Sequence, residues 1–260
     1  MISAFRRRPG RAVQSRPRAA LATSLLLGAL AGCSGAHDGP FAGDAKAAAI
    51  DAAAKPGTAM SALTGLPVKR AASKAGYDRV RDFGPPWSDD TSAPGSHNHC
   101  DTRNDILHRD LRNPVLQAGS KCVIASGTLD DPYTGKVIRF QRGRQSSAVQ
   151  IDHLVALSDG WRTGAQQLTQ DQREAMANDP LNLLAVDGPT NQAKGDRDAS
   201  EWLPPRKAFD CSYVARQIAV KRQYRLWVTP AENEAMKRVL ASCPAQPLPT
   251  EDSPGVALRP

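Results

Sequence analysis

The N-terminal segment of this 260-residue chain most constrains where the remainder can fold. Residues 1–32 contain six arginines and no acidic residue, and an apolar stretch runs from Ala19 to Ala31. A basic region, a short apolar region and small residues after it are typical of an export signal, which is removed from the mature protein. Removing these six arginines takes the formal net charge from +8 to +2. We therefore expect an exported, nearly neutral mature protein, whose charge alone gives no argument for DNA binding.

Cys33 ends the segment Leu30-Ala31-Gly32-Cys33, which resembles the lipobox of bacterial lipoproteins. We expect Cys33 to carry a lipid anchor that holds the protein at the outer face of the cell membrane, with simple secretion as the alternative. No apolar run approaches the roughly 20 residues that span a bilayer. The lipid is therefore the only membrane contact that the sequence predicts.

Four cysteines follow Cys33 in the sequence: Cys100, Cys122, Cys211 and Cys243. An even number of cysteines in an exported protein indicates disulfides, and four cysteines allow three pairings. Pairing sequence neighbours closes the shortest loops, so we expect the disulfides Cys100–Cys122 and Cys211–Cys243. Zinc binding is the alternative, but no two of these cysteines have the C-x-x-C spacing of structural zinc sites.

Composition divides the chain into four parts. Residues 1–32 are the expected signal peptide. Residues 33–66 are rich in Ala, Gly, Ser and Pro, and they predict a flexible tether because they offer few large apolar side chains to bury. Residues 244–260 contain five prolines and predict a disordered tail. A single domain is expected between them, over residues 67–243.

The hydrophobic patterns of this domain predict an α+β fold that is mainly helical. Helical spacing favours helices over residues 101–111, 166–178, 211–224 and 230–240. Residues 122–125 and 137–140 bracket a turn-rich segment and predict a β-hairpin. Short strands are expected at residues 149–152 and 181–186. Asp187 then supplies a helix cap, and Pro189 opens a short helix that runs through Lys194.

Three short polar stretches suggest a common site, namely Asp152-His153, Asn182 and Asn191. The predicted order of strand, strand and helix would bring them to one pocket. Carboxylate and carboxamide oxygens are hard ligands that suit Mg²⁺, and a histidine with an ordinary pKa near ~6.5 can accept a proton at neutral pH. Neighbouring strand residues point to opposite faces, so Asp152 and His153 can serve one site only near a strand end.

The order Asp-His, Asn-Leu and Asn-x-x-Lys resembles the ββα-metal finger of HNH endonucleases. The wider frame is similar to exported bacterial HNH proteins related to the GmrSD nuclease C-terminal domain, over roughly residues 77–243. This resemblance implies an HNH-like ββα-metal finger embedded in a mainly helical single domain with a β-hairpin. The matching motifs are Thr102-Arg103, Asp131-Pro-Tyr-Thr-Gly135, Gln150-Ile-Asp-His153, Asn178-Asp-Pro-Leu-Asn-Leu183, Asn191-Gln-Ala-Lys194-Gly195-Asp196 and Trp202-Leu-Pro-Pro205.

The resemblance also implies roles for individual residues. His153 would be the general base, and Asp152 and Asn191 would bind Mg²⁺, Mn²⁺ or another divalent ion. Asn182 would tie the loop between the strands and so orient His153. Lys194 would approach the phosphate.

Basic residues around these motifs suggest a path for the substrate. Phosphate contacts would weaken steeply with salt, and no base-reading element is evident, so we expect backbone contacts with little sequence specificity. The expected partner is DNA, with RNA left open, and no protein partner is identifiable. The expected phosphate-binding residues are Arg103, Arg139, Arg142, Arg144 and Arg197.

These observations predict an exported, metal-dependent endonuclease that hydrolyses phosphodiester bonds of DNA. Two alternatives stay open. One is a cell-surface lipoprotein that binds nucleic acid or wall polymer without cutting it. The other is a phosphodiesterase that uses the same metal site on a substrate other than nucleic acid.

Overall fold

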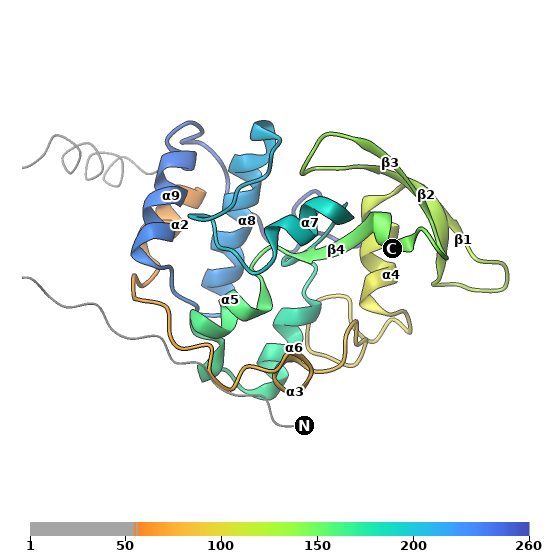
Figure 1. The fold of residues 1–260 in the computed structure, drawn as a ribbon, viewed down its shortest axis with the longest axis horizontal. Helices are drawn as coiled ribbons and strands as arrows, with labels where there is room; N and C mark the ends of the chain where they lie inside the picture. The colour runs from red at the N-terminus through yellow and green to blue at the C-terminus, as the bar shows by residue number, and fades with distance from the viewer. Residues whose placement is uncertain (1–54, 56, 260) are drawn as a thin grey trace, which may run out of the picture. The chain divides into compact units, whose positions relative to one another are not determined.

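A computed structural model describes residue 55 and residues 57–259, and the chain forms an α+β fold (Figure 1). The predicted signal peptide and Cys33 lie outside the described residues. Within these residues, no helix is both long and apolar enough to cross a membrane. The elements in chain order are α2 (Ala59–Thr64), α3 (Arg79–Phe83), α4 (Thr102–Asp110), β1 (Arg112–Leu116), β2 (Ile124–Asp130), β3 (Val137–Gln141), η1 (Ser146–Ala148), β4 (Val149–His153), α5 (Leu157–Arg162), η2 (Ala165–Gln167), α6 (Gln170–Asn178), β5 (Leu183–Asp187), α7 (Gly188–Lys194), η3 (Lys207–Phe209), α8 (Asp210–Gln223) and α9 (Pro230–Leu240).

The strands β1, β2 and β3 form an antiparallel sheet in that order. Its inner face packs on α4, where Phe140 and Leu107 share a buried cluster. Gly127 permits this close packing, because a Cβ atom there would lie 2.9 Å from Leu111 Cδ1. The β2–β3 hairpin was predicted, but β1 was not. Pro114 and a mostly exposed surface remove the alternation that predicts a strand, as is common for edge strands.

The strands β4 and β5 form a second antiparallel pair, in which Asp152 lies opposite Leu184. The helix α7 begins directly after β5, because the Asp187 side chain accepts a hydrogen bond from the Thr190 N–H at 2.9 Å and Pro189 occupies the first turn. It packs against both strands. The connection from β4 to β5 contains α5, η2 and α6, and the predicted order of strand, strand and helix is present.

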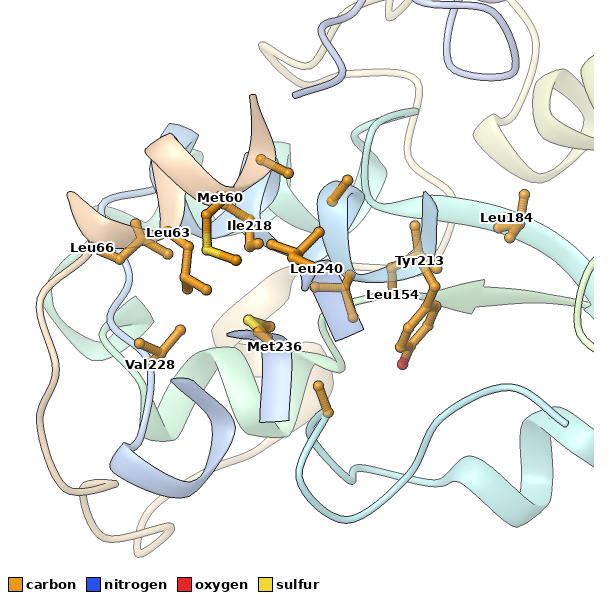
Figure 2. Packing of buried hydrophobic residues seen from close by; sticks show 14 of the residues in the cluster. Met60, Leu63, Leu66, Leu154, Leu184, Tyr213, Ile218, Val228, Met236 and Leu240 are labelled. Atoms are coloured by element: carbon orange, nitrogen blue, oxygen red, sulfur yellow. The ribbon is translucent and has the colours of Figure 1, made fainter. Parts of the chain in front are cut away.

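The helix α8 lies at the centre of the largest buried cluster, with α2 and α9 packed beside it (Figure 2). Met60 and Leu63 of α2 are buried there with Ile218 and Met236. The domain therefore begins before residue 67, and the predicted boundary of the tether is wrong. The average composition of residues 33–66 hides a short helix whose few apolar side chains find a complementary surface on α8 and α9.

The C-terminal segment packs on the domain as well. Val256 is only 1% exposed. Arg109 Nη1 donates to Val256 O at 3.1 Å, and Arg216 Nη1 donates to Gly255 O at 3.4 Å. The prediction of a disordered tail is therefore wrong for residues 244–259. The reason is tertiary, since these two buried guanidinium groups need carbonyl acceptors and the segment supplies some of them.

Deleting residues 251–260 should lower the free energy of unfolding by about 2–4 kcal/mol, because it removes the burial of Val256 and two carbonyl acceptors from buried arginines. Urea unfolding of the full chain and the truncated chain measures this difference. Asp252→Ala is the matched control, since Asp252 is exposed in the same segment. Equal stability of the truncated and full chains would show that the segment contributes no packing energy.

Both expected disulfides are present in the structure. Cys100–Cys122 joins the loop before α4 to the loop before β2, and Cys211–Cys243 joins the start of α8 to the segment that follows α9. All four cysteines are paired in this way, so none of them is free to bind zinc. The two closed loops restrict the unfolded chain, which stabilises the fold.

Candidate active site

A pocket of about 320 Å³ lies beside β4 and the C-terminal half of α7. Asp152, His153 and Asn191 all contribute to its lining, together with Gln150 and Arg79. The structure thus brings together three of the predicted site residues from separate stretches of sequence. The strand β4 ends at His153, which is the position that two neighbouring strand residues need if both are to serve one site.

Asp152 is held by two donors in the interior. Its Oδ1 atom accepts from Lys194 Nζ at 2.9 Å, and its Oδ2 atom accepts from the Tyr133 hydroxyl. Burial raises the pKa of Asp152, and the Lys194 ammonium and the Tyr133 hydroxyl oppose that rise. Lys194 Nζ also donates to His153 O at 2.8 Å. These contacts fix the end of β4 to the end of α7.

The position of Lys194 corrects the role that its motif implied. Its side chain is 0% exposed and forms an ion pair with Asp152. A fully buried ammonium cannot meet a phosphate that arrives from solvent, so Lys194 does not approach the substrate in this structure. Its charge instead compensates the buried carboxylate, which would be costly to bury alone.

His153 is 8% exposed, and its ring is fixed on two sides. Its Nε2 atom lies 2.8 Å from Ala177 O, and the ring stacks on Trp87 with centroids 5.9 Å apart. A carbonyl oxygen can only accept, so Nε2 carries the proton and Nδ1 keeps its lone pair. Burial, with the nearby charge of Arg79, lowers the pKa of His153 to about 3. The imidazole is therefore neutral at physiological pH.

Asn182 is fully buried just before β5 and contacts the turn that follows His153. Its Oδ1 atom accepts from Val155 N at 2.9 Å, and its Nδ2 atom donates to Val155 O and Met176 O, each at 3.3 Å. The Asn182 side chain thus joins the end of β4 to the end of α6. This arrangement limits how far the backbone at His153 can move.

Asn191 lies on α7 with one amide atom engaged. Its Nδ2 atom donates to Gln150 Oε1 at 3.0 Å. Within the described part of the chain, its Oδ1 atom has no hydrogen-bond partner. The carboxamide oxygen of Asn191 is therefore available to a ligand in the pocket.

These donors fit one class of metal ion. Asp152 and Asn191 offer oxygen atoms, and the described residues contain no group of three or more His, Cys, Asp or Glu side chains arranged to hold a metal. Zinc sites usually need three or four protein ligands. Mg²⁺ is commonly bound by one or two protein oxygens and takes its other ligands from water and phosphate. The donor chemistry of the pocket therefore suits Mg²⁺ or a similar ion.

The predicted phosphate-binding arginines divide into two groups, and none of them lines the pocket. Arg142 donates to Ile124 O and to Asn104 Oδ1, each at 2.6 Å, and Arg103 donates to Val149 O at 3.3 Å. These bonds attach both side chains to the protein itself, and their contact with substrate stays a prediction. The other three arginines are exposed: Arg139, Arg144 and Arg197.

The sequence patterns did not indicate that the segment before α4 contributes residues to the pocket. Tyr77 and Arg79 of this segment line the pocket, and Asp196 and Ser158 lie beside them. Asp196 accepts from Ser158 at 3.1 Å and from Lys74 at 2.8 Å, which attaches the early segment to the residues after α7. The aromatic side chains of this otherwise loop-like stretch were the available signal.

Two comparisons relate this chain to known proteins. Residues 101–239 match the family described as GmrSD restriction endonucleases, C-terminal domain. The chain belongs to this family. The GmrSD C-terminal domain match includes β4, β5 and α7, and it begins after Tyr77, Arg79 and Trp87.

The chain is also similar to an "Uncharacterized secreted protein" of Arthroderma benhamiae. The two are 38% identical over 188 residues, which cover 72% of this chain and 85% of that protein. No solved structure matches the chain. The two disulfides are consistent with a location outside the cytoplasm.

Proposed function

We propose that this protein is an exported, metal-dependent endonuclease of the HNH type that hydrolyses phosphodiester bonds of DNA. One observation carries the proposal: Asp152, His153 and Asn191 line a single pocket although they lie far apart in sequence. Membership of the GmrSD C-terminal domain family supports a nuclease. The order β4, β5 and α7 supports the interpretation as a ββα-metal finger, in which α5 and α6 form a long insertion.

In this mechanism Asp152 and Asn191 would hold Mg²⁺ or Mn²⁺. The chemistry that such an ion supplies is neutralisation of charge on the phosphate and stabilisation of the leaving oxygen. His153 would take the proton of the attacking water at Nδ1, while its Nε2–H stays bonded to Ala177 O. Its pKa of about 3 lies below the ordinary value near ~6.5 that the sequence predicted, so the ring is a weak base until the anionic phosphate of the substrate raises that pKa. Asn182 would act as a positioning residue through Val155.

The exposed arginines fit contacts to the sugar–phosphate backbone. Arg139, Arg144 and Arg197 carry charge at the surface and are the most accessible of the five predicted arginines. Such contacts give affinity without reading bases, which supports cleavage with little sequence specificity. We also propose that Cys33 is lipidated after export, which would keep the enzyme at the cell surface.

A second candidate is a binding lipoprotein that keeps the fold and does not cut. The observation in its favour is that both carboxylate oxygens of Asp152 already have protein partners. A carboxylate engaged in this way binds a metal ion weakly unless the Lys194 ammonium moves away from it. Such a protein would retain DNA in a salt-sensitive manner and show no metal-dependent cleavage.

Nicking of supercoiled plasmid tests the proposal. The purified chain should nick plasmid with Mg²⁺ or Mn²⁺, and EDTA should stop the reaction, because the phosphate would lose the neutralising cation. Gel electrophoresis of a time course measures the rate. Nicking that persists in EDTA, or no nicking with either ion, contradicts the proposal.

Parallel reactions distinguish the other substrates. Cleavage of RNA without cleavage of DNA would show that the enzyme is a ribonuclease rather than a DNA endonuclease. Hydrolysis of bis(p-nitrophenyl) phosphate without any cleavage of nucleic acid would favour a phosphodiesterase for a different natural substrate. Salt-sensitive DNA retention without cleavage would favour the binding lipoprotein.

A further inference from the structure

The pocket needs a cation that can meet an anionic substrate. Lys194 was expected to supply it, but its ammonium is fully buried and paired with Asp152. Of the described residues that line this pocket, Arg79 is the one arginine or lysine with an exposed side chain.

We propose that Arg79 binds the phosphate of the substrate in this pocket. The inference rests on the proposed function for the identity of the substrate, and it assigns the binding of a phosphodiester to a residue outside the segment that matches the family. A guanidinium suits this task, because its planar N–H groups can donate two parallel hydrogen bonds to the non-bridging oxygens.

Arg79 forms no hydrogen bond or ion pair with any other residue that the structure describes. Its neighbour Arg81 differs, since Arg81 Nε donates to Asp82 Oδ1 at 2.9 Å. A guanidinium without an ion pair can bind a phosphate directly, because no existing ion pair has to be broken first. Arg79 is therefore free for a ligand, whereas Arg81, two residues later in the sequence, is engaged.

The short helix α3 holds Arg79 at a defined place. Its first turn is capped by Asp78, whose Oδ1 atom accepts from Arg81 N at 2.8 Å. Arg173 of α6 donates to Asp82 O at 2.6 Å, and Phe83 is buried. These contacts attach α3 to α6, so the Arg79 backbone is anchored and only its side chain needs to be ordered by substrate.

The walls of the pocket support a phosphodiester as the ligand. Arg79 lines the pocket together with the carboxamide side chains of Asn191 and Gln150. Asp196, the second acidic residue of the lining, is already engaged by Lys74. A ligand with one negative charge and several hydrogen-bond acceptors matches this combination of one free cation and neutral amides.

Equilibrium binding tests this role without requiring cleavage. The full chain carrying His153→Ala is titrated against a short fluorescent DNA duplex in EDTA, at several NaCl concentrations. Adding Arg79→Ala should weaken binding by about tenfold and reduce the slope of log K against log salt by about one, because one phosphate contact is lost. Arg79→Lys keeps the charge and should keep the slope.

Arg238→Ala is the matched control, because Arg238 is exposed on α9 and does not line this pocket. It should leave both affinity and slope at the values of the parent protein. An Arg79→Ala variant that behaves like Arg238→Ala overturns the inference, and so does a parent protein without salt-dependent binding. If Arg79→Ala reduces the slope but the wild type never cleaves DNA, the inference holds and the nuclease proposal fails.

Discussion

Replacing His153 by alanine should reduce plasmid nicking by about 10²–10⁴-fold, since the attacking water would lose its proton acceptor. The same change should also cost about 1–3 kcal/mol of stability, because Ala177 O would lose its donor and Trp87 its stacking partner. This loss of stability follows from the burial of the ring, which is only 8% exposed.

His153→Gln separates the two effects. Its amide N–H can still donate toward Ala177 O, but glutamine cannot accept a proton from water at neutral pH. We expect His153→Gln to recover most of the stability lost in His153→Ala while nicking stays equally low. Nicking rates and urea unfolding of both variants measure the outcome. A His153→Gln protein that cleaves at the wild-type rate would remove the general-base assignment.

Replacing Lys194 by methionine should lower the free energy of unfolding by about 3–5 kcal/mol, because it leaves the buried carboxylate of Asp152 without its ion pair. The double variant Lys194→Met/Asp152→Asn should recover much of this loss, since no uncompensated charge would remain. Denaturant unfolding of the single and double variants gives the coupling energy between the two residues.

An ion pair with an exposed lysine in the same domain provides the control. Lys207 and Asp210 are 3.4 Å apart, and the side chains of Lys207 and Asp210 are 75% and 13% exposed. Lys207→Met should change stability by less than about 1 kcal/mol, because water already screens the charge of the lysine. If Lys194→Met is no more destabilising than Lys207→Met, then the buried pair is not important for stability and Lys194 is free to serve the substrate.

Local patterns predicted much of the fold because their physical causes are local. The helix after β5 followed from Asp187 and Pro189, which act within one turn. The disulfides followed from the number and spacing of the cysteines. The convergence of Asp152 and Asn191 on one pocket followed from the order of strand, strand and helix.

The features that escaped prediction depend on distant partners. Lysine is almost never fully buried unless it is paired, and nothing near Lys194 in sequence identifies Tyr133 and Asp152 as its surroundings. The tail beyond residue 243 has the composition of a disordered segment, yet Arg109 and Arg216 bind its carbonyl oxygens. Arg79 lies on the pocket only because α3 is anchored to α6.

The long connection between β4 and β5 has a consequence for any attempt to isolate the site. The carbonyl that fixes the His153 ring belongs to Ala177, and the carbonyls that bind Asn182 belong to Val155 and Met176. All three carbonyls lie in the connection between β4 and β5. A minimal peptide made of the two strands and α7 with a short artificial turn would delete all of them. A functional transplant of this site to another protein therefore has to include the whole connection between β4 and β5, because its folded structure supplies these contacts.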